Sequence, residues 1–229
     1  MTGRARIPRP AVQRLSMYLR ELERREAAGE STVSSSGLGA ACGVTGAQVR
    51  KDLGSLGRTG RPGIGYGVHE LARSIRSAIG VHRSWRAALV GAGNIGRALA
   101  AYGRFQDEGF EIAAAFDRAP GVVGRRVAGM MVEPMDSLPK AIRERGIDIG
   151  IIAVPTEAAQ GVAEVLVAAG VRGILNFAAT RLHVAGEVPI VDVDFRAALE
   201  RLALEVSERS ARPERGGRST PGARARRLS

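Results

Sequence analysis

The chain has 229 residues, 45% of them hydrophobic, and a formal net charge of +11. Its single cysteine, Cys42, excludes an intrachain disulfide and a multi-cysteine zinc site. No apolar run reaches the roughly 18 residues of a membrane span, and no signal-like apolar block follows the charged N-terminus, so we expect a soluble, cytoplasmic protein with neither a membrane nor a metal partner.

Charge is distributed unevenly along the chain. Residues 1–86 hold 15 Lys and Arg against 6 Asp and Glu, residues 87–208 hold 12 against 16, and residues 209–229 hold 7 against 1. A polyanionic partner should therefore meet the two ends rather than the middle. On charge alone, an arginine-rich sequence with solvated surfaces is the alternative.

The N-terminal segment predicts a helix-turn-helix. Residues 11–26 place leucines at i, i+4 and i+7, which is one apolar stripe of a helix. Residues 29–37 are rich in Ser and Gly and should form a loop whose serines cap a short second helix, ending at Gly43. Thr45 is a suitable N-cap for a third helix with its own apolar stripe. Two short helices joined by a tight glycine-containing turn are typical of this motif.

The third helix carries the residues that we expect to contact DNA. Gln48, Arg50 and Lys51 lie off its apolar stripe and should face outward. Arg50 and Lys51 are suited to contacts with phosphate or guanine. A helix-turn-helix can also serve protein interaction alone, but the basic N-terminal segment favours double-stranded DNA as the partner.

Residues 57–68 are too rich in glycine for a helix, and we predict a β-hairpin wing there. Tyr66 and Val68 alternate as they would in a strand. Arg58 and Arg61 in this wing are placed to meet the DNA backbone or the minor groove. A linking helix over residues 71–81 should follow.

From Ala87 onward, short apolar strands alternate with helices, which indicates a parallel sheet covered on both faces. The fold class is therefore α/β, with a winged helix-turn-helix followed by a Rossmann-type parallel-sheet domain and a C-terminal helix. The expected strands cover residues 87–90, 110–116, 147–154, 173–176 and 188–191, and the expected helices cover 95–105, 137–145, 156–169 and 194–207.

The strongest local signal is the stretch Gly91-Ala92-Gly93-Asn94-Ile95-Gly96, a G-x-G-x-x-G motif between a strand and a helix. Its first glycine allows a tight turn, its second lets the backbone approach a pyrophosphate, and its third lets helix and strand pack closely. Asp117 ends the next strand, where an acidic residue binds the adenosine ribose of NAD.

The form of the dinucleotide depends on the charges beside Asp117. Arg118, Arg125 and Arg126 could accept the 2′-phosphate of NADP, but solvated loop arginines are the simpler interpretation, so we expect NADH and NAD+.

Further cofactor contacts should come from the carboxyl edge of the sheet, where Val154, Pro155 and Asn176 end two strands, although a plain turn is an equal alternative there. No His or Lys follows a strand in a catalytic arrangement, so we predict no catalytic residue and no enzyme activity. The alternatives are an NAD(P)-dependent oxidoreductase with an accessory basic domain and a CoA-ligase-like nucleotide-binding module.

Together these motifs resemble the Rex family of redox-sensing transcriptional repressors, in the same domain order and over nearly everything from Pro10 to Leu204. The wing differs, because many members have Thr-Arg-Gly where this chain has Arg61-Pro62-Gly63, and the tail beyond Arg209 lies outside the pattern. The resemblance is carried by RLSMYLR (Arg14–Arg20), VTGAQVRKDL (Val44–Leu53), GIGY (Gly63–Tyr66), ALVGAGNIGRALAAY (Ala88–Tyr102), AAFD (Ala114–Asp117), GILNFA (Gly173–Ala178) and VDF (Val193–Phe195).

The resemblance implies a homodimer whose C-terminal helix, starting at Asp194, is swapped onto the partner subunit. It implies that Phe195 reaches the partner's nicotinamide pocket and that Arg20, Tyr102 and Asp194 form a switch network that differs between cofactor states, with Tyr102 also near the cofactor. It further implies that NADH favours a closed dimer released from its palindromic operator, whereas the NAD+ or free form binds DNA.

We accordingly divide the chain into four parts. Residues 1–80 form the winged-helix DNA-binding domain and residues 81–192 the NAD(H)-binding Rossmann domain. Residues 193–208 form a dimerisation helix, and residues 209–229 form a disordered Arg-rich tail.

Overall fold

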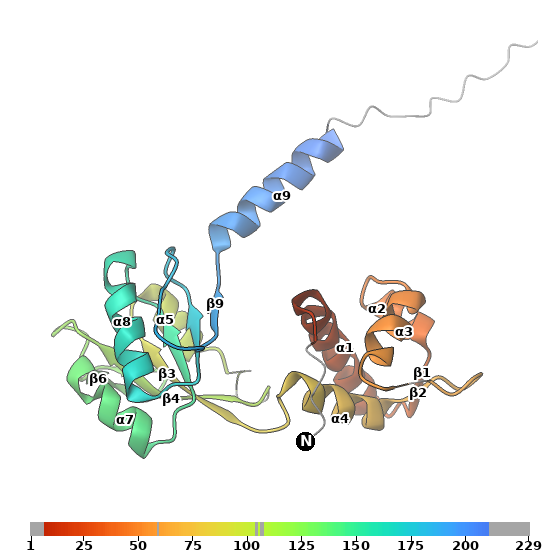
Figure 1. Ribbon diagram of the computed structural model, residues 1–229, viewed down its shortest axis with the longest axis horizontal. Helices are drawn as coiled ribbons and strands as arrows, with labels where there is room; N and C mark the ends of the chain where they lie inside the picture. Colours follow the sequence, from red (N-terminus) through yellow and green to blue (C-terminus); the bar gives the residue numbers. More distant parts are fainter. Residues whose placement is uncertain (1–6, 59, 104, 106–107, 211–229) are drawn as a thin grey trace, which may run out of the picture.

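The computed structural model describes residues 7–58, 60–103, 105 and 108–210, so the predicted tail lies outside the described residues beyond position 210. Two bodies of secondary structure are joined by an extended connection, and one long helix projects from the second body (Figure 1). Within the described residues, no helix is both long and apolar enough to cross a membrane.

The first body packs its helices around one apolar core. Leu15 and Leu22 of the first helix, Leu38 of the second and Leu53 of the third are all fully buried in this core. The stripes predicted for the first and third helices therefore do face inward. The elements are α1 (Arg9–Ala27), β1 (Thr32–Val33), α2 (Ser35–Ala41), α3 (Gly46–Gly54), β2 (Tyr66–Gly67) and α4 (Val68–Ile79).

The predicted helix starts are confirmed by their caps. The Ser34 hydroxyl accepts a hydrogen bond from the Gly37 N–H at 2.9 Å, and the Thr45 hydroxyl accepts one from the Gln48 N–H at 3.1 Å. Each cap satisfies an N–H group that the first helical turn leaves unpaired. Gly43, between the two helices, has φ +68°, which a side chain would strain. This turn sets α3 beside α2.

The wing departs from its prediction. Tyr66 and Gly67 pair antiparallel with Val33 and Thr32, whereas the described residues of the wing itself hold one bridge, between Arg61 and Gly65. Val68, predicted to lie in the strand, is instead the first residue of α4. The reason is that Val68 is buried in the helical core, so the alternation of Tyr66 with Val68 matches two buried positions on different elements.

The second body is a seven-stranded sheet in the order β5-β6-β4-β3-β7-β8-β9. Neighbouring strands are parallel except β5 and β6, which form an antiparallel pair at one edge. The strands are β3 (Trp85–Val90), β4 (Phe110–Asp117), β5 (Arg126–Val127), β6 (Met130–Pro134), β7 (Ile149–Ile152), β8 (Gly173–Asn176) and β9 (Ile190–Asp192).

Helices cover both faces of this sheet, as predicted. Along β3, Ala87 and Leu89 face one core cluster while Ala88 and Val90 face the other. The chain leaves β3 toward β4 on one side and returns to β7 on the other, so the strand order reverses beside β3. The helices are α5 (Asn94–Ala100), η1 (Met135–Ser137), α7 (Leu138–Glu144) and α8 (Thr156–Ala169), followed by α9 (Phe195–Ser210).

Several predicted bounds were wrong in detail. Helix α5 ends at Ala100 rather than near residue 105, β7 is shorter at both ends than residues 147–154, and β9 lies slightly later than residues 188–191. The β5–β6 hairpin was not predicted at all. It is short and partly exposed, so its sequence has neither a long apolar run nor a strong alternation.

Candidate functional site

The glycine-rich loop joins β3 to α5 and faces the point where the strand order reverses. Gly91 has φ +98°, and a Cβ there would lie 2.5 Å from the Ala153 carbonyl oxygen. A Cβ on Gly96 would overlap the Gly91 carbonyl oxygen. A Cβ on Gly93 would meet nothing within 4 Å. The first and third glycines are thus required by the protein's own packing, and the second borders open space.

The Asp117 side chain, at the end of β4, is hydrogen-bonded to this loop. Its Oδ2 accepts a hydrogen bond from the Ala92 N–H at 2.8 Å, and its Oδ1 accepts one from the Ala119 N–H at 2.9 Å. A carboxylate has about four acceptor positions, so Asp117 keeps capacity for a hydroxyl group. Asp117 is therefore both a structural tie and a possible ribose ligand.

A cleft opens beside the loop at the carboxyl edge of the sheet. Asp117 and Arg118 provide its charged side chains, and the other lining groups are apolar or backbone. Of the predicted cofactor residues, the structure thus brings together Gly91, Gly93, Asp117 and two residues that follow β7. The lining residues are Val90, Gly91, Gly93, Asp117, Arg118, Met135, Ala153, Val154, Pro155, Ala158 and Val162.

The remaining residues of the motif lie around the cleft rather than in its lining. Ala92 is buried and donates its N–H to Asp117. Asn94 begins α5 and accepts a hydrogen bond from Arg97, and Ile95 is 42% exposed on the same helix. The first turn of α5 presents unpaired N–H groups and the positive end of the helix dipole to the cleft, which suits a phosphate group.

Asn176, at the end of β8, is held by the protein's own hydrogen bonds. Its side chain is fully buried and donates to the Thr180 carbonyl at 2.9 Å and to Asp192 at 2.8 Å, while accepting from the Ala178 N–H at 3.0 Å. These bonds hold the end of β8 to β9 and to the loop after β8. Asn176 itself is buried, and the residues that follow it line a hollow.

That second hollow lies between the loop after β8 and the start of α9. The rings of Phe177 and Phe195 lie on its two sides, with 6.2 Å between their centroids. Phe195 is 58% exposed. Phe195, the residue predicted to reach a nicotinamide ring, therefore lies at the surface of its own subunit.

The predicted switch residues are exposed and separate in the single chain. The Tyr102 ring packs edge-on against Phe105 at 4.8 Å, and the Asp194 carboxylate accepts from the Ala197 N–H at 2.9 Å, which caps α9. Arg20 is exposed on α1. Across the described ranges, no hydrogen bond or ion pair joins any two of these three residues.

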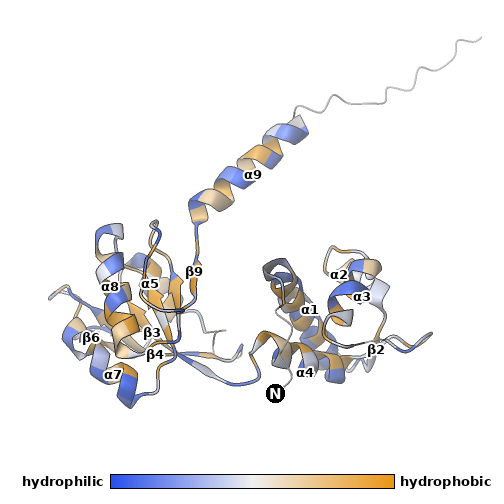
Figure 2. Ribbon diagram, in the orientation of Figure 1, coloured by the Kyte–Doolittle hydropathy of each residue, from blue (hydrophilic) through white to orange (hydrophobic). Residues whose placement is uncertain are grey.

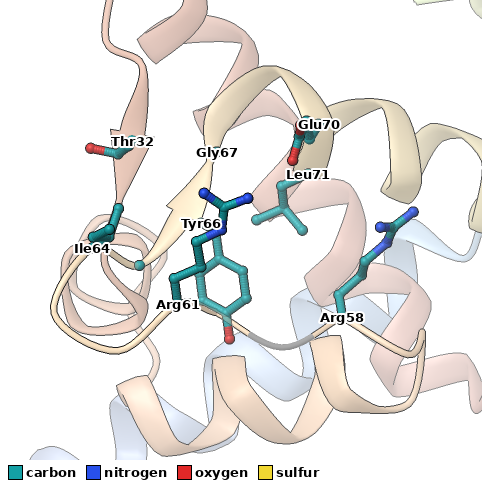
Figure 3. Close-up of a pocket in the computed structure, with 9 residues that line it drawn as sticks. Thr32, Arg58, Arg61, Ile64, Tyr66, Gly67, Glu70 and Leu71 are labelled. Atoms are coloured by element: carbon teal, nitrogen blue, oxygen red, sulfur yellow. The ribbon is translucent and has the colours of Figure 1, made fainter.

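The predicted DNA-contacting residues occupy the outer side of α3 and the wing. Arg50 and Lys51 are exposed, and Arg50 donates to the Ser35 hydroxyl at 2.8 Å. Gln48 is only half exposed, because its amide donates to Asp52 at 2.9 Å. Arg58 and Arg61 line a hollow at the base of the wing (Figure 3).

A buried carboxylate in α3 was missed by the sequence interpretation. Asp52 is 4% exposed and is bound by both nitrogens of the Arg14 fork, each at 2.7 Å, and by the Tyr18 hydroxyl at 2.9 Å. Hydrogen bonding to Arg14 lowers the pKa of the Asp52 carboxyl, and burial raises the pKa of the Tyr18 hydroxyl. The only sign of it in the sequence is that Asp52 lies directly before Leu53 of the predicted apolar stripe, and its partner Arg14 is 38 residues away.

Comparison with known proteins follows this division into two bodies. A family model described as "CoA binding domain" matches residues 82–180, and one described as "Putative DNA-binding protein N-terminus" matches residues 6–54. The chain is 44% identical over 206 residues to the redox-sensing transcriptional repressor Rex of Rhodopirellula baltica, covering 90% of this chain and 87% of that one. This chain belongs to the Rex family.

Other Rex proteins match over similar lengths. The Rex of Thermus thermophilus is 45% identical, covering 93% of this chain and all of that one, and the Rex of Streptomyces coelicolor is 42% identical, covering 96% and 85%. These relatives are named as transcriptional repressors rather than as enzymes.

Solved Rex-family structures confirm the predicted fold class. The chain matches RSP in complex with β-NAD+ and operator DNA with a TM-score of 0.84 at 31% identity, covering 90% of this chain and 95% of that one. RSP in complex with β-NADH matches with a TM-score of 0.78 at 30% identity, covering 89% and 96%. The winged helix-turn-helix and the Rossmann-type sheet are therefore established for this Rex-family chain.

Proposed function

We propose that this chain is a redox-sensing transcriptional repressor, which binds palindromic operator DNA and is released when NADH occupies the cleft beside its glycine-rich loop. The observation that carries the proposal is that one chain combines two features. Helix α3 exposes basic side chains, and a Cβ on Gly93 would meet nothing within 4 Å beside the cleft. The repressor therefore reports the ratio of NADH to NAD+, and acts in the cytoplasm, where its DNA lies.

The DNA-binding part rests on charge and on the exposed face of α3. Arg50 and Lys51 point away from the core that buries Val49 and Leu53, so they are available to base edges and phosphates. Arg58 and Arg61 extend the basic surface along the wing. We assign Gln48, which lies in the first turn of α3, to the same interface.

The coenzyme part rests on the fit of the cleft to a dinucleotide. Gly93 and the first turn of α5 would hold the pyrophosphate, Asp117 the adenosine ribose, and Val154 and Pro155 the middle of the molecule. NADH supplies a neutral nicotinamide ring, whereas NAD+ supplies a cationic one. An apolar surface such as that of Phe177 and Phe195 favours the neutral ring, because burying a charge without a partner is costly.

The dimer part rests on α9. This helix extends away from the sheet, and Figure 2 shows apolar stretches along it. Phe195, Leu199, Leu202 and Val206 recur on one side of the helix, and each is more than half exposed. The occupant that we propose for this stripe is a second copy of the chain, with α9 swapped so that Phe195 enters the partner's nicotinamide pocket.

Such a dimer also explains the separate switch residues. Arg20, Tyr102 and Asp194 are exposed within one chain, so they are free to meet across two subunits. We propose that their pairing changes with the coenzyme and shifts the population between two spacings of the reading helices.

A gel-shift titration tests the proposal directly. In vitro selection with the full-length chain supplies a palindromic duplex, and its retention is then measured with NADH or with NAD+. We expect micromolar NADH to abolish the shift and NAD+ to leave it. A shift that is indifferent to NADH would overturn the sensor function and favour an NAD(P)-dependent enzyme with a basic domain.

A further inference from the structure

Helix α3 contains a buried anion in the middle of its basic surface. Asp52 follows directly after Lys51 and lies one helical turn after Gln48, yet its side chain is 4% exposed. Its carboxylate accepts four side-chain hydrogen bonds, from both Arg14 nitrogens at 2.7 Å and from Tyr18 and Gln48 at 2.9 Å each. This set fills the acceptor capacity of a carboxylate.

Stability alone is a weak reason for this arrangement. Replacing a buried ion pair by apolar side chains of similar volume is often neutral or stabilising, because the pair must repay its lost hydration. Apolar contacts are non-directional, whereas a bidentate arginine fork fixes both the distance and the plane of its carboxylate. The cluster of Arg14, Tyr18 and Asp52 therefore supplies geometry that leucines in its place would lack.

The geometry concerns the rotation of α3 about its own axis. Arg14 and Tyr18 lie four residues apart on α1, so two points of α1 hold one point of α3. Successive helical residues are separated by about 100°, which places Arg50 about 200° around the helix from Asp52. Fixing Asp52 against α1 thus holds Arg50 on the outer side, where its exposure confirms it.

The same carboxylate orients Gln48. An ionised carboxylate has no proton to donate, so the part of the Gln48 amide facing Asp52 must be its NH2 group. Among the residues that the structure describes, none donates a hydrogen bond to the Gln48 side-chain oxygen. Gln48 also lies in the first turn of α3, and the N-terminal residues of a recognition helix are those that contact base edges.

We propose that Asp52 is a positioning residue for operator recognition, which sets the rotation of α3 against α1 and turns Gln48 so that its carbonyl oxygen is offered to a base amino group. This inference rests on the DNA-binding function proposed above. The amino groups that the major groove presents are N6 of adenine and N4 of cytosine. Gln48 should therefore favour one of these groups on the strand it faces.

The test compares affinities of the full-length chain for its selected palindrome and for a scrambled duplex of equal length. The variants are Asp52→Asn, Tyr18→Phe and the pair Arg14→Leu/Asp52→Leu, which keeps an apolar contact between the helices. The matched control is Glu23→Gln, which breaks the Glu23–Arg76 pair between α1 and α4, 2.9 Å long, without touching α3. Thermal melts confirm that each protein is folded at the assay temperature.

We expect the ratio of the two affinities to fall at least tenfold for the paired-leucine variant and for Asp52→Asn, with a smaller fall for Tyr18→Phe. Affinity for the scrambled duplex and for NADH should stay within twofold, and Glu23→Gln should behave as the unsubstituted chain. A folded paired-leucine variant with an unchanged ratio would overturn the positioning role, even if Asp52→Asn is too unstable to measure.

A second selection with Gln48→Ala tests the orientation of the amide. We expect the base preference to weaken at one position in each half-site, at adenine or cytosine. Unchanged preferences, or a loss confined to guanine, would contradict the orientation. Failure of the proposed function is distinct from all these outcomes, because the unsubstituted chain would then select no palindrome or would ignore NADH.

Discussion

The three glycines of the loop after β3 differ in what a side chain would meet, so they allow a separation of coenzyme binding from folding. A Cβ on Gly93 enters open space beside the cleft, whereas a Cβ on Gly91 or Gly96 collides with backbone. Gly93→Val should therefore fold normally and still bind DNA, while its side chain occupies the pyrophosphate position. We expect NADH affinity to fall at least a hundredfold and DNA binding to become insensitive to NADH, as measured by NADH fluorescence and gel shift.

The matched comparison is Gly96→Val, which should lower the melting temperature of the sheet domain because α5 can no longer pack close to β3. A Gly93→Val protein that is released from DNA by NADH as readily as the unsubstituted chain would show that the coenzyme lies elsewhere.

Acid sensitivity of the N-terminal domain is a second expectation at the level of single residues. Hydrogen bonding to Arg24 and Arg25 lowers the pKa of Glu21 from 4.5 to about 2, and Arg14 lowers the pKa of Asp52 below its ordinary 3.8. Groups with lowered native pKa values stabilise the fold above their unfolded values and lose that contribution as the pH falls through the native ones. The urea concentration at the midpoint of unfolding should therefore be constant above about pH 5 and fall steeply from about pH 4.5 toward pH 2.

Glu21→Gln isolates one of these contributions. It should lower the free energy of unfolding by about 1 kcal/mol at pH 7, since its partners are partly solvated, and make the acid loss shallower. If the free energy of unfolding depends on pH equally in both proteins, protonation of Glu21 does not contribute to the acid sensitivity.

Among the secondary-structure elements, α9 carries the expectation for assembly. Each residue of its stripe, Phe195, Leu199, Leu202 and Val206, is more than half exposed. Leu202→Asp should raise the dimer dissociation constant roughly a hundredfold, because an unpaired carboxylate in an apolar interface costs about 3 kcal/mol or more. Light scattering across a dilution series measures this change.

Ser207→Asp is the control, because it adds the same charge to α9 away from the stripe. If Leu202→Asp remains a dimer at nanomolar concentration, the subunits do not associate through this face.

The elements differ in how well the sequence predicts them, for physical reasons. Helix α8 and strand β8 were predicted with correct bounds, since buried apolar runs between turn signals allow few alternatives. The pairing of β1 with β2 was missed, because two-residue strands carry no periodicity. The side-chain partners of Asp52 and Asn176 were not predicted, since only the folded chain brings Arg14 to Asp52 and Asp192 to Asn176.

At the scale of the whole molecule, the N-terminal domain and the sheet domain are joined by a short junction between α4 and β3. The Trp85 indole donates to the Gly80 carbonyl at 2.9 Å, linking the end of α4 to the start of β3. Arg83 lies over the indole ring at 3.8 Å from its centroid. Val81 packs against the core of the first body, so only three residues separate the two anchored ends. We expect a junction this short to transmit a rotation of one body to the other.

Binding linkage gives this coupling a quantitative form. If NADH weakens operator binding by some factor, the operator must weaken NADH binding by the same factor. Trp85→Phe keeps an aromatic ring but removes the hydrogen bond to Gly80, so it should reduce both factors equally, by about fivefold or more, while each ligand alone binds as before. Fluorescence titrations of NADH with and without operator, and of labelled operator with and without NADH, measure the two factors. Unchanged factors in Trp85→Phe would place the transmission outside this junction, and unequal factors would mean that more than these two equilibria are being observed.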